Sequence, residues 1–179
     1  MAKQLRADAR DNRALLLAAG REVFAADGPG APLDRVARHA GVGNATMYRH
    51  FPNRRELLAA VYAGEVDALR AEGEALLSSS DPDEALYEWL RRFVEHVKDK
   101  RELALSISDE PDDREALFSE WHATINTTAA ALAARARLAV DVEPLDLLLL
   151  ATGIALAGAP AARTDHLLAL LRRGTAPSA

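Results

Sequence analysis

The most informative stretch of the chain is Val36-Ala-Arg-His-Ala-Gly-Val-Gly-Asn-Ala-Thr-Met-Tyr-Arg-His-Phe-Pro-Asn-Arg-Arg-Glu-Leu-Leu58. It contains two short helical segments separated by Gly41, and glycine readily adopts the left-handed backbone with which many helices end. Val36 and Ala40 supply small or branched apolar contacts before the turn, and we expect Val42 to point back between the two helices. The stretch therefore predicts a helix-turn-helix motif.

The second helix of this motif, expected at about residues 44–51, is rich in polar side chains. It carries an amide, hydroxyls, a guanidinium and an imidazole, whereas a buried helix of this length would need several Leu or Ile. Such groups form hydrogen bonds with base edges and phosphates when a recognition helix enters the major groove. We expect Asn44 to cap this helix and Met47 and Phe51 to belong to the core.

The segment from Ala40 to Leu58 resembles the DNA-binding segment of the tetracycline-repressor (TetR) family. The similarity continues upstream through Arg13, the run Leu15–Ala19 and Asp27-Gly28, so that it covers roughly residues 10 to 62. The resemblance implies an all-α protein with an N-terminal three-helix DNA-binding domain. It also implies a C-terminal helical domain for dimerisation and ligand binding.

The resemblance further implies a set of DNA contacts, from Asn44, Ala45, Thr46, Tyr48, Arg49, His50 and Arg54. Tyr48, His50 and Arg54 are expected on the phosphate backbone. Asn44 is suited to adenine and Arg49 to guanine, because their paired hydrogen-bonding groups match those base edges. Thr46 can donate to a phosphate or offer its methyl group to thymine. Two structural alternatives stay open: Tyr48 packing on the first helix, and His50 capping a helix end.

Two positions depart from the family pattern. Gly43 and Asn44 stand where many members have Ser followed by a basic residue, and Pro32 stands where Ser or Thr usually caps the second helix. We expect Pro32 and Leu33 to set the start of that helix instead. Base preference therefore cannot be carried over from the family, and a helical interaction protein with a degenerate DNA-binding head is an alternative.

The distribution of charge supports the motif. The chain has a net charge of −5, yet residues 1–62 contain ten basic and six acidic side chains, a net of +4. The remainder has 12 basic and 21 acidic side chains, a net of −9. Runs of charge often mark solvated helix faces. Here the positive charge coincides with the motif, which favours phosphate contact there and repulsion elsewhere.

Composition excludes several classes of protein. The chain has no cysteine, which rules out disulfide scaffolds, thiolate metal sites and cysteine nucleophiles. The polar start Met-Ala-Lys-Gln-Leu-Arg-Ala-Asp lacks the apolar core of a signal peptide. We therefore expect a cytoplasmic protein without metal or cofactor.

Helical periodicity covers nearly the whole chain, so the predicted fold class is all-α. We predict nine helices, at about residues 10–26, 34–40, 44–51, 54–77, 82–98, 101–108, 112–140, 144–158 and 163–173. Residues 1–53 form the predicted DNA-binding domain with its N-terminal arm, and residues 54–179 the ligand-sensing and dimerisation domain. The apolar run Leu145–Ala162 is too short to span a membrane, which takes about 20 apolar residues.

A dimer is expected, because helix-turn-helix proteins usually bind pseudo-palindromic sites in pairs. Leu-rich helices are often simple core, but the family forms a four-helix interface from its last two long helices, and the last two helices of this chain look like their counterpart. The interface candidates are Leu145, Leu148, Leu149, Thr152, Leu156, Leu167, Leu168 and Leu171.

A pocket for a small apolar effector is also implied by the family. Trp89, Phe93 and His96 share one helical face, and Trp121, His122 and Ile125 are expected on a facing wall. Each of these side chains can equally belong to an ordinary core.

An enzyme is disfavoured because the chain has no Gly-rich phosphate loop, nucleophile elbow or His-Glu-x-x-His signature. We therefore predict a sequence-specific DNA-binding transcriptional regulator, as a repressor that binds a pseudo-palindromic operator as a homodimer and is released by a small molecule. Its partners are double-stranded DNA, a second copy and the effector, without a membrane.

Overall fold

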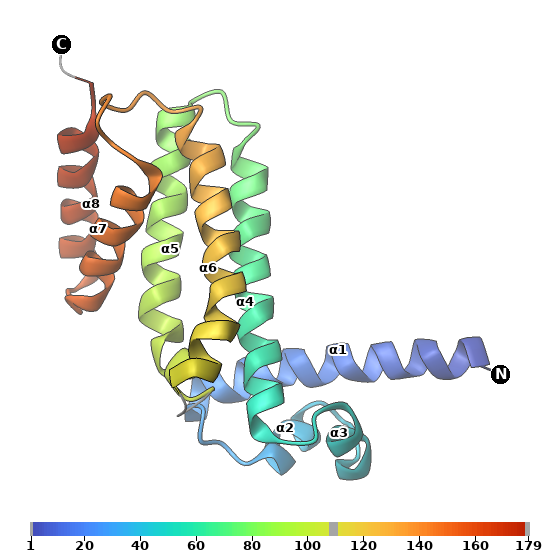
Figure 1. Ribbon diagram of the computed structural model, residues 1–179. Coiled ribbons are helices and arrows are strands. Elements are labelled where there is room, and N and C mark those ends of the chain that lie inside the picture. Colours follow the sequence, from blue (N-terminus) through green and yellow to red (C-terminus); the bar gives the residue numbers. More distant parts are fainter. Residues whose placement is uncertain (1, 108–110, 178–179) are drawn as a thin grey trace. The chain divides into compact units, whose positions relative to one another are not determined.

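The computed structural model describes residues 2–107 and 111–177, and every regular element in those residues is a helix (Figure 1). The helices are α1 (Ala2–Asp27), α2 (Leu33–His39), α3 (Asn44–His50), α4 (Arg54–Leu76), α5 (Pro82–Leu105), α6 (Pro111–Ala133), α7 (Pro144–Leu156) and α8 (Ala161–Thr175). The predicted all-α fold is confirmed. Among these residues no helix is long and apolar enough to cross a bilayer.

Three predicted helix bounds are wrong. The helices expected at 82–98 and 101–108 form one helix, α5, because Asp99, Lys100 and Arg101 are compatible with a helix and interrupt nothing. For the same reason α1 begins at Ala2 rather than near residue 10. α6 ends at Ala133 rather than Val140. Beyond it, the backbone N–H of Arg137 donates to the Asp83 carboxylate at 2.7 Å instead of continuing the helix.

The chain forms two compact units. The first contains residues 1–64 with 102–114, and the second contains residues 65–101 with 115–179. Residues 54–64 of α4 thus belong to the first unit and residues 65–76 to the second. The predicted domain division after residue 53 stays a prediction.

The core of the first unit forms where α1, α2, α3 and the start of α4 bury their apolar faces. Leu16, Val36 and Leu57 are fully buried there. Gly20 allows α1 and α4 to approach closely, because a Cβ atom at this position would lie 2.9 Å from Cγ2 of Val61. The Arg13 guanidinium lies over the ring of Phe51, 5.4 Å from its centroid.

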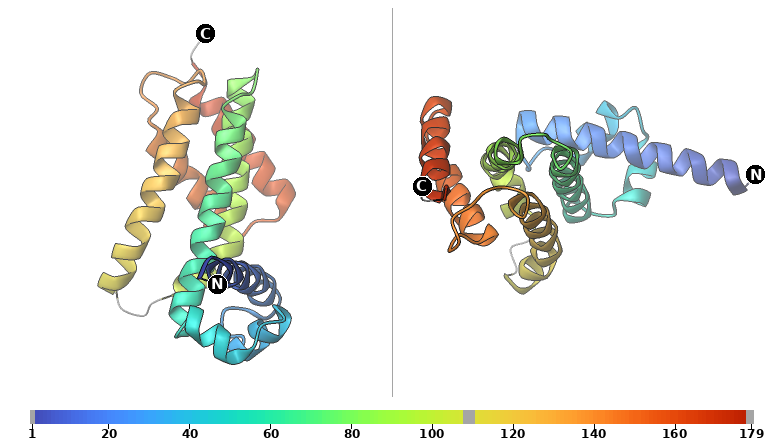
Figure 2. Two further views of the ribbon diagram at one scale, coloured as in Figure 1. Left: turned by 90° about the vertical axis from the view of Figure 1, so that its right-hand side faces the viewer. Right: turned by 90° about the horizontal axis from the view of Figure 1, so that it is seen from above.

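In the second unit, residues of α4, α5 and α6 run side by side, and α7 and α8 form an adjacent helix pair (Figure 2). Trp89 of α5, Leu132 of α6 and Leu147 of α7 fill the interior. Polar contacts join α8 to α5. The Tyr87 and Thr175 hydroxyls are hydrogen-bonded at 2.5 Å, and Arg91 pairs with Asp165. The second unit is therefore held together by a continuous core with a polar rim.

Candidate nucleic-acid interface and C-terminal surfaces

The turn between α2 and α3 has the predicted geometry. Gly41 has a φ of +67°, which confirms its left-handed conformation. Its N–H donates to the Arg38 carbonyl at 3.2 Å, and the N–H of Val42 donates to the Ala37 carbonyl at 2.9 Å. Val42 is buried, as predicted. These paired bonds end α2 and fix the direction in which α3 leaves the turn.

The short helix α3, at residues 44–50, is anchored by one deeply buried side chain. Met47 is 0% exposed and Phe51, just after the helix, is 2% exposed, so both core predictions are confirmed. Tyr48 is 46% exposed, and Asn44 and Arg49 are also exposed. The helix therefore directs its apolar side inward and leaves a polar face open.

The prediction that Asn44 caps α3 is wrong. Gly43 occupies the cap position, with a φ of −66° and a ψ of 146°, and Asn44 is the first helical residue. Because glycine has no side chain to cap the helix, the first N–H groups of α3 depend on other acceptors. α2 starts similarly: Pro32 stands at its cap and the helix begins at Leu33, one residue before the predicted start.

Arg49 and Thr46 form a pair on the exposed face. Nη2 of Arg49 donates to Oγ1 of Thr46 at 2.8 Å, one turn earlier in the helix. The hydroxyl thereby holds the guanidinium along α3 and restricts its rotamers. Thr46 acts here as a positioning residue for the side chain expected to contact guanine.

Arg54 supports the motif from the start of α4. Its Nη1 atom donates to the carbonyl oxygens of Pro29 at 2.8 Å and Ala31 at 2.5 Å, and the side chain is partly buried. Asn53 caps the same helix, since its Oδ1 accepts from the N–H of Glu56 at 3.0 Å. Sequence reasoning missed these carbonyl bonds, which tie α4 to the loop before α2.

An ion pair and a hydrogen bond at the surface join α2 to α1. Arg35 lies 2.9 Å from Asp27, and Nε2 of His39 lies 2.6 Å from Glu22. Exposed pairs of this kind contribute at most about 1 kcal/mol each. The buried apolar residues therefore stabilise the motif more than these surface contacts do.

The effector residues predicted on α5 belong largely to the interior. Trp89 is fully buried, stacks on Phe93 at 5.9 Å between ring centroids and donates to the Leu69 carbonyl at 3.0 Å. His96 lines a polar groove between α4 and α5. Burial lowers the pKa of its imidazole, and Lys100 adds to that shift, while Glu65 and Asp99 oppose it.

The residues predicted on α6 are spread around that helix. Ile125 is buried, Trp121 is half-buried and His122 is exposed. The Phe118 ring contacts both Trp121, at 5.1 Å, and His122, at 5.8 Å between centroids. Trp89 thus lies in the interior and His122 at the surface, and the predicted effector site formed by these residues stays a prediction. Among the residues that the structure describes, no group of three or more His, Asp and Glu side chains is arranged to hold a metal ion.

The predicted dimer residues divide into three groups by exposure. Leu148 of α7 and Leu168 of α8 are buried within one copy of the chain. Leu145, Leu149 and Leu156 are 53%, 62% and 57% exposed on the opposite side of α7. Thr152, Leu167 and Leu171 are half-buried. Sequence reasoning missed Leu150 and Leu170, which are 52% and 44% exposed.

These features define an all-helical protein that presents a short polar helix from a helix-turn-helix head. Residues 16–61 match the family model for bacterial regulatory proteins of the tetR family, and residues 81–177 match the C-terminal domain of SbtR-like transcriptional regulators. The chain belongs to the tetR family of bacterial transcriptional regulators.

Solved structures agree over nearly the whole chain. A TetR transcriptional regulator from Streptomyces coelicolor is 34% identical, with a TM-score of 0.73, over 93% of this chain and 99% of that one. A TetR transcription regulatory protein from Mycobacterium vanbaalenii is 30% identical, with a TM-score of 0.76, over 96% of this chain and 99% of that one.

Curated relatives match over a shorter range. The HTH-type transcriptional repressor LfrR of Mycolicibacterium smegmatis is 37% identical over 102 residues, which is 57% of this chain and 51% of LfrR. The HTH-type transcriptional regulator TtgW of Pseudomonas putida is 40% identical over 73 residues, 40% of this chain and 54% of TtgW. The chain thus spans about half the length of these curated relatives.

Proposed function

We propose that this chain is a cytoplasmic transcriptional repressor that binds a pseudo-palindromic operator as a homodimer and is released by a small molecule. The observation that carries the proposal is the exposed polar face of α3, which Met47 anchors from the buried side. Exposed amide, hydroxyl, phenol and guanidinium groups on so short a helix suit the edges of bases and the phosphates beside them.

The homodimer is supported by the exposed leucines of the last two helices. Leu145, Leu149 and Leu156 recur at intervals that place them on one face of α7, and Gly153 beside them leaves room for close approach, because a Cβ there would contact nothing within 4 Å. Exposed apolar patches of this kind mark interaction surfaces. Because members of the family act as dimers, a second copy of this chain is the expected partner for this face. Two heads would then meet half-sites about 34–36 Å apart.

The decisive experiment is fluorescence anisotropy with the DNA upstream of the gene, against a scrambled duplex, at two salt concentrations. We expect tight, sequence-dependent binding that weakens steeply with salt. Arg49→Ala should cost about 1–3 kcal/mol on the operator and relax base preference at one position. The matched control is Arg173→Ala, which removes the same charge from the exposed end of α8.

Equal losses for Arg49→Ala on the operator and on operators mutated base by base would contradict the base contact. If the unaltered chain binds every duplex equally, and a selection from the whole genome also yields no preferred sequence, the alternative is favoured. That alternative is an interaction protein with a degenerate DNA-binding head. The cap positions occupied by Gly43 and Pro32 are the features that favour this alternative.

A further inference from the structure

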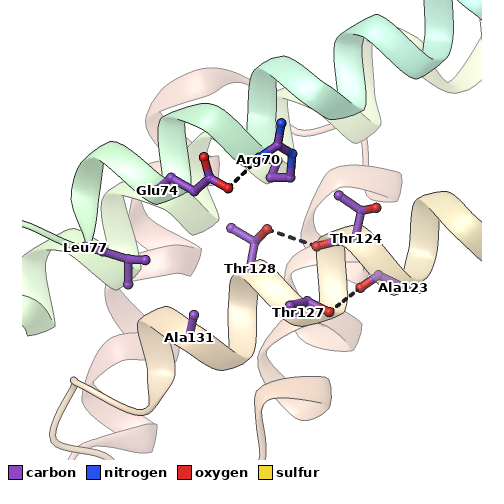
Figure 3. Close-up of a pocket in the computed structure, with 8 residues that line it drawn as sticks. All are labelled: Arg70, Glu74, Leu77, Ala123, Thr124, Thr127, Thr128 and Ala131. Atoms are coloured by element: carbon purple, nitrogen blue, oxygen red, sulfur yellow. Dashed lines mark hydrogen bonds and ion pairs between the residues drawn. The ribbon is translucent and has the colours of Figure 1, made fainter.

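A cavity of about 390 Å³ lies between α4 and α6 within the second unit (Figure 3). Arg70 and Glu74 of α4 and Leu77, just after that helix, line one side, and α6 lines the other with alanines and threonines alone. Its volume falls within the range of about 300–1,000 Å³ that is usual for small-molecule sites. None of these residues was among the predicted effector contacts.

The cavity is built from short side chains and is not a general separation of the helices. A Cβ atom at Gly73 would lie 2.3 Å from Cγ2 of Thr128 and 2.9 Å from Nε1 of Trp89. α4 and α6 therefore touch beside the cavity. Further along α6, the side chains of Ala123 and Thr127 are too short to fill the space opposite Arg70 and Glu74.

The polar groups of the lining favour a ligand that donates hydrogen bonds. The hydroxyls of Thr124, Thr127 and Thr128 donate to backbone carbonyls four residues earlier, at 3.1, 2.8 and 2.9 Å. A hydroxyl has one proton, so each oxygen keeps only acceptor capacity toward the cavity. The Glu74 carboxylate is also an acceptor, and Figure 3 shows it paired with Arg70 on α4, across from the helix that carries the threonines.

The charges point the same way. Arg70 is held by two carboxylates, Glu74 at 2.5 Å and Asp67 at 3.6 Å, so the local sum of these three charges is negative. An anionic ligand that approaches the guanidinium would be repelled by these two carboxylates. A cationic ligand can donate a hydrogen bond to the Glu74 carboxylate. Because both groups are ionised, that hydrogen bond is stronger than one between neutral groups.

We propose that the cavity between α4 and α6 binds a small molecule with an apolar body and a protonated amine. The ammonium group donates to Glu74 and to threonine oxygens, and the apolar body lies against Leu77 and the small side chains of α6. Its role as the effector site rests on the proposed repressor function. α4 carries both the cavity residue Glu74 and, at its start, Arg54, so a ligand that moves α4 acts on a helix used by the recognition motif.

The test uses two dyes that share one fluorophore, dansylcadaverine with an ammonium group and dansylglycine with a carboxylate. We expect the full-length chain to bind one dansylcadaverine per chain, at least tenfold tighter than dansylglycine. Glu74→Gln should weaken dansylcadaverine at least fivefold and reduce the difference between the dyes. Glu72→Gln is the matched control, because it removes a carboxylate of the same helix that pairs with Arg92.

A second variant, Ala123→Phe, fills the cavity from an exposed position and should abolish binding without changing the thermal melting curve. Absence of binding, equal or tighter binding of dansylglycine, or unchanged affinity in both Glu74→Gln and Ala123→Phe would overturn the proposal. DNA is absent from this titration, so its result is independent of operator binding. If the dye binds but does not release the operator, the site stands and its role as an effector site is rejected.

Discussion

The recognition helix α3 and the helix α7 make opposite use of their exposed faces. α3 has seven residues, buries Met47 and exposes polar side chains. α7 has 13 residues, buries Leu147, Leu148, Ala151 and Ala155, and still exposes large apolar side chains on its other face. The chemistry of what each helix leaves uncovered indicates its partner: a hydrated polyanion for α3 and an apolar protein surface for α7.

The two helices also differ in how they are held. α3 follows a turn fixed by Gly41, and Arg54 braces the loop before α2 through two carbonyl oxygens. α7 rests on an apolar interior, and ion pairs and hydrogen bonds attach its neighbour α8 to α5. Polar bracing sets the direction of a short helix, whereas α7 needs only to present its surface.

The largest expected effect comes from breaking the apolar face. Leu156→Arg puts a charge at a position of the proposed interface that is 57% exposed, at the end of α7. We expect monomers in light scattering and an operator affinity at least 100-fold lower, because paired heads bind about 10²–10⁴ times more tightly than one. Val140→Arg is the control, since Val140 is fully exposed and lies in the loop before α7. An intact Leu156→Arg dimer would remove this interface.

The next effect concerns the anchor of α3. Met47→Ala deletes a fully buried side chain and should lower the free energy of unfolding by about 2–5 kcal/mol. Denaturant unfolding measures this loss. Operator affinity should fall with it, because α3 loses the buried side chain that holds it in place. Tyr48→Ala, at the exposed neighbouring position, should change the free energy of unfolding by less than about 0.5 kcal/mol. Equal destabilisation by both variants would mean that Met47 does not anchor the helix.

The contrast also shows which features a sequence can predict. Gly41, Met47 and Phe51 were predicted correctly because their signals are local: a glycine at a helix end and apolar residues at helical spacing. The carbonyl partners of Arg54 lie 25 and 23 residues away, so only the folded chain brings them together. The cavity on α6 escaped prediction because small residues such as Ala123 pack tightly in some folds and leave space in others.

A substitution of Arg54 should have an effect of intermediate size. It distinguishes a structural role, bonding to the loop before α2, from a contact with DNA phosphate. Arg54→Ala leaves two carbonyl groups without this donor and should cost about 1–3 kcal/mol of stability. The sequence also predicts weaker binding to all DNA and a salt dependence reduced by about one unit of slope. Binding at several salt concentrations measures that slope. If stability falls while the slope is unchanged, the guanidinium only braces the loop and does not contact phosphate.

The smallest expected effect tests polar bracing in the second unit. The Asp83 carboxylate accepts from the backbone N–H of Arg137 at 2.7 Å and from its guanidinium at 2.9 and 2.7 Å, and these bonds lower the pKa of Asp83 below its ordinary 3.8.

A carboxyl group whose pKa is lowered by folding stabilises the protein above its unfolded pKa, and this contribution disappears as the pH falls through the folded value. Asp83→Asn should therefore lower the free energy of unfolding at pH 7 by less than about 1 kcal/mol, because Arg137 is largely exposed. This loss should appear as a slightly lower melting temperature. The difference from the unaltered chain should shrink below about pH 3.8. Asp141→Asn, in an exposed loop, should show no such trend. A difference that stays constant with pH would show that the bracing comes from packing around the loop and not from the ionised carboxylate.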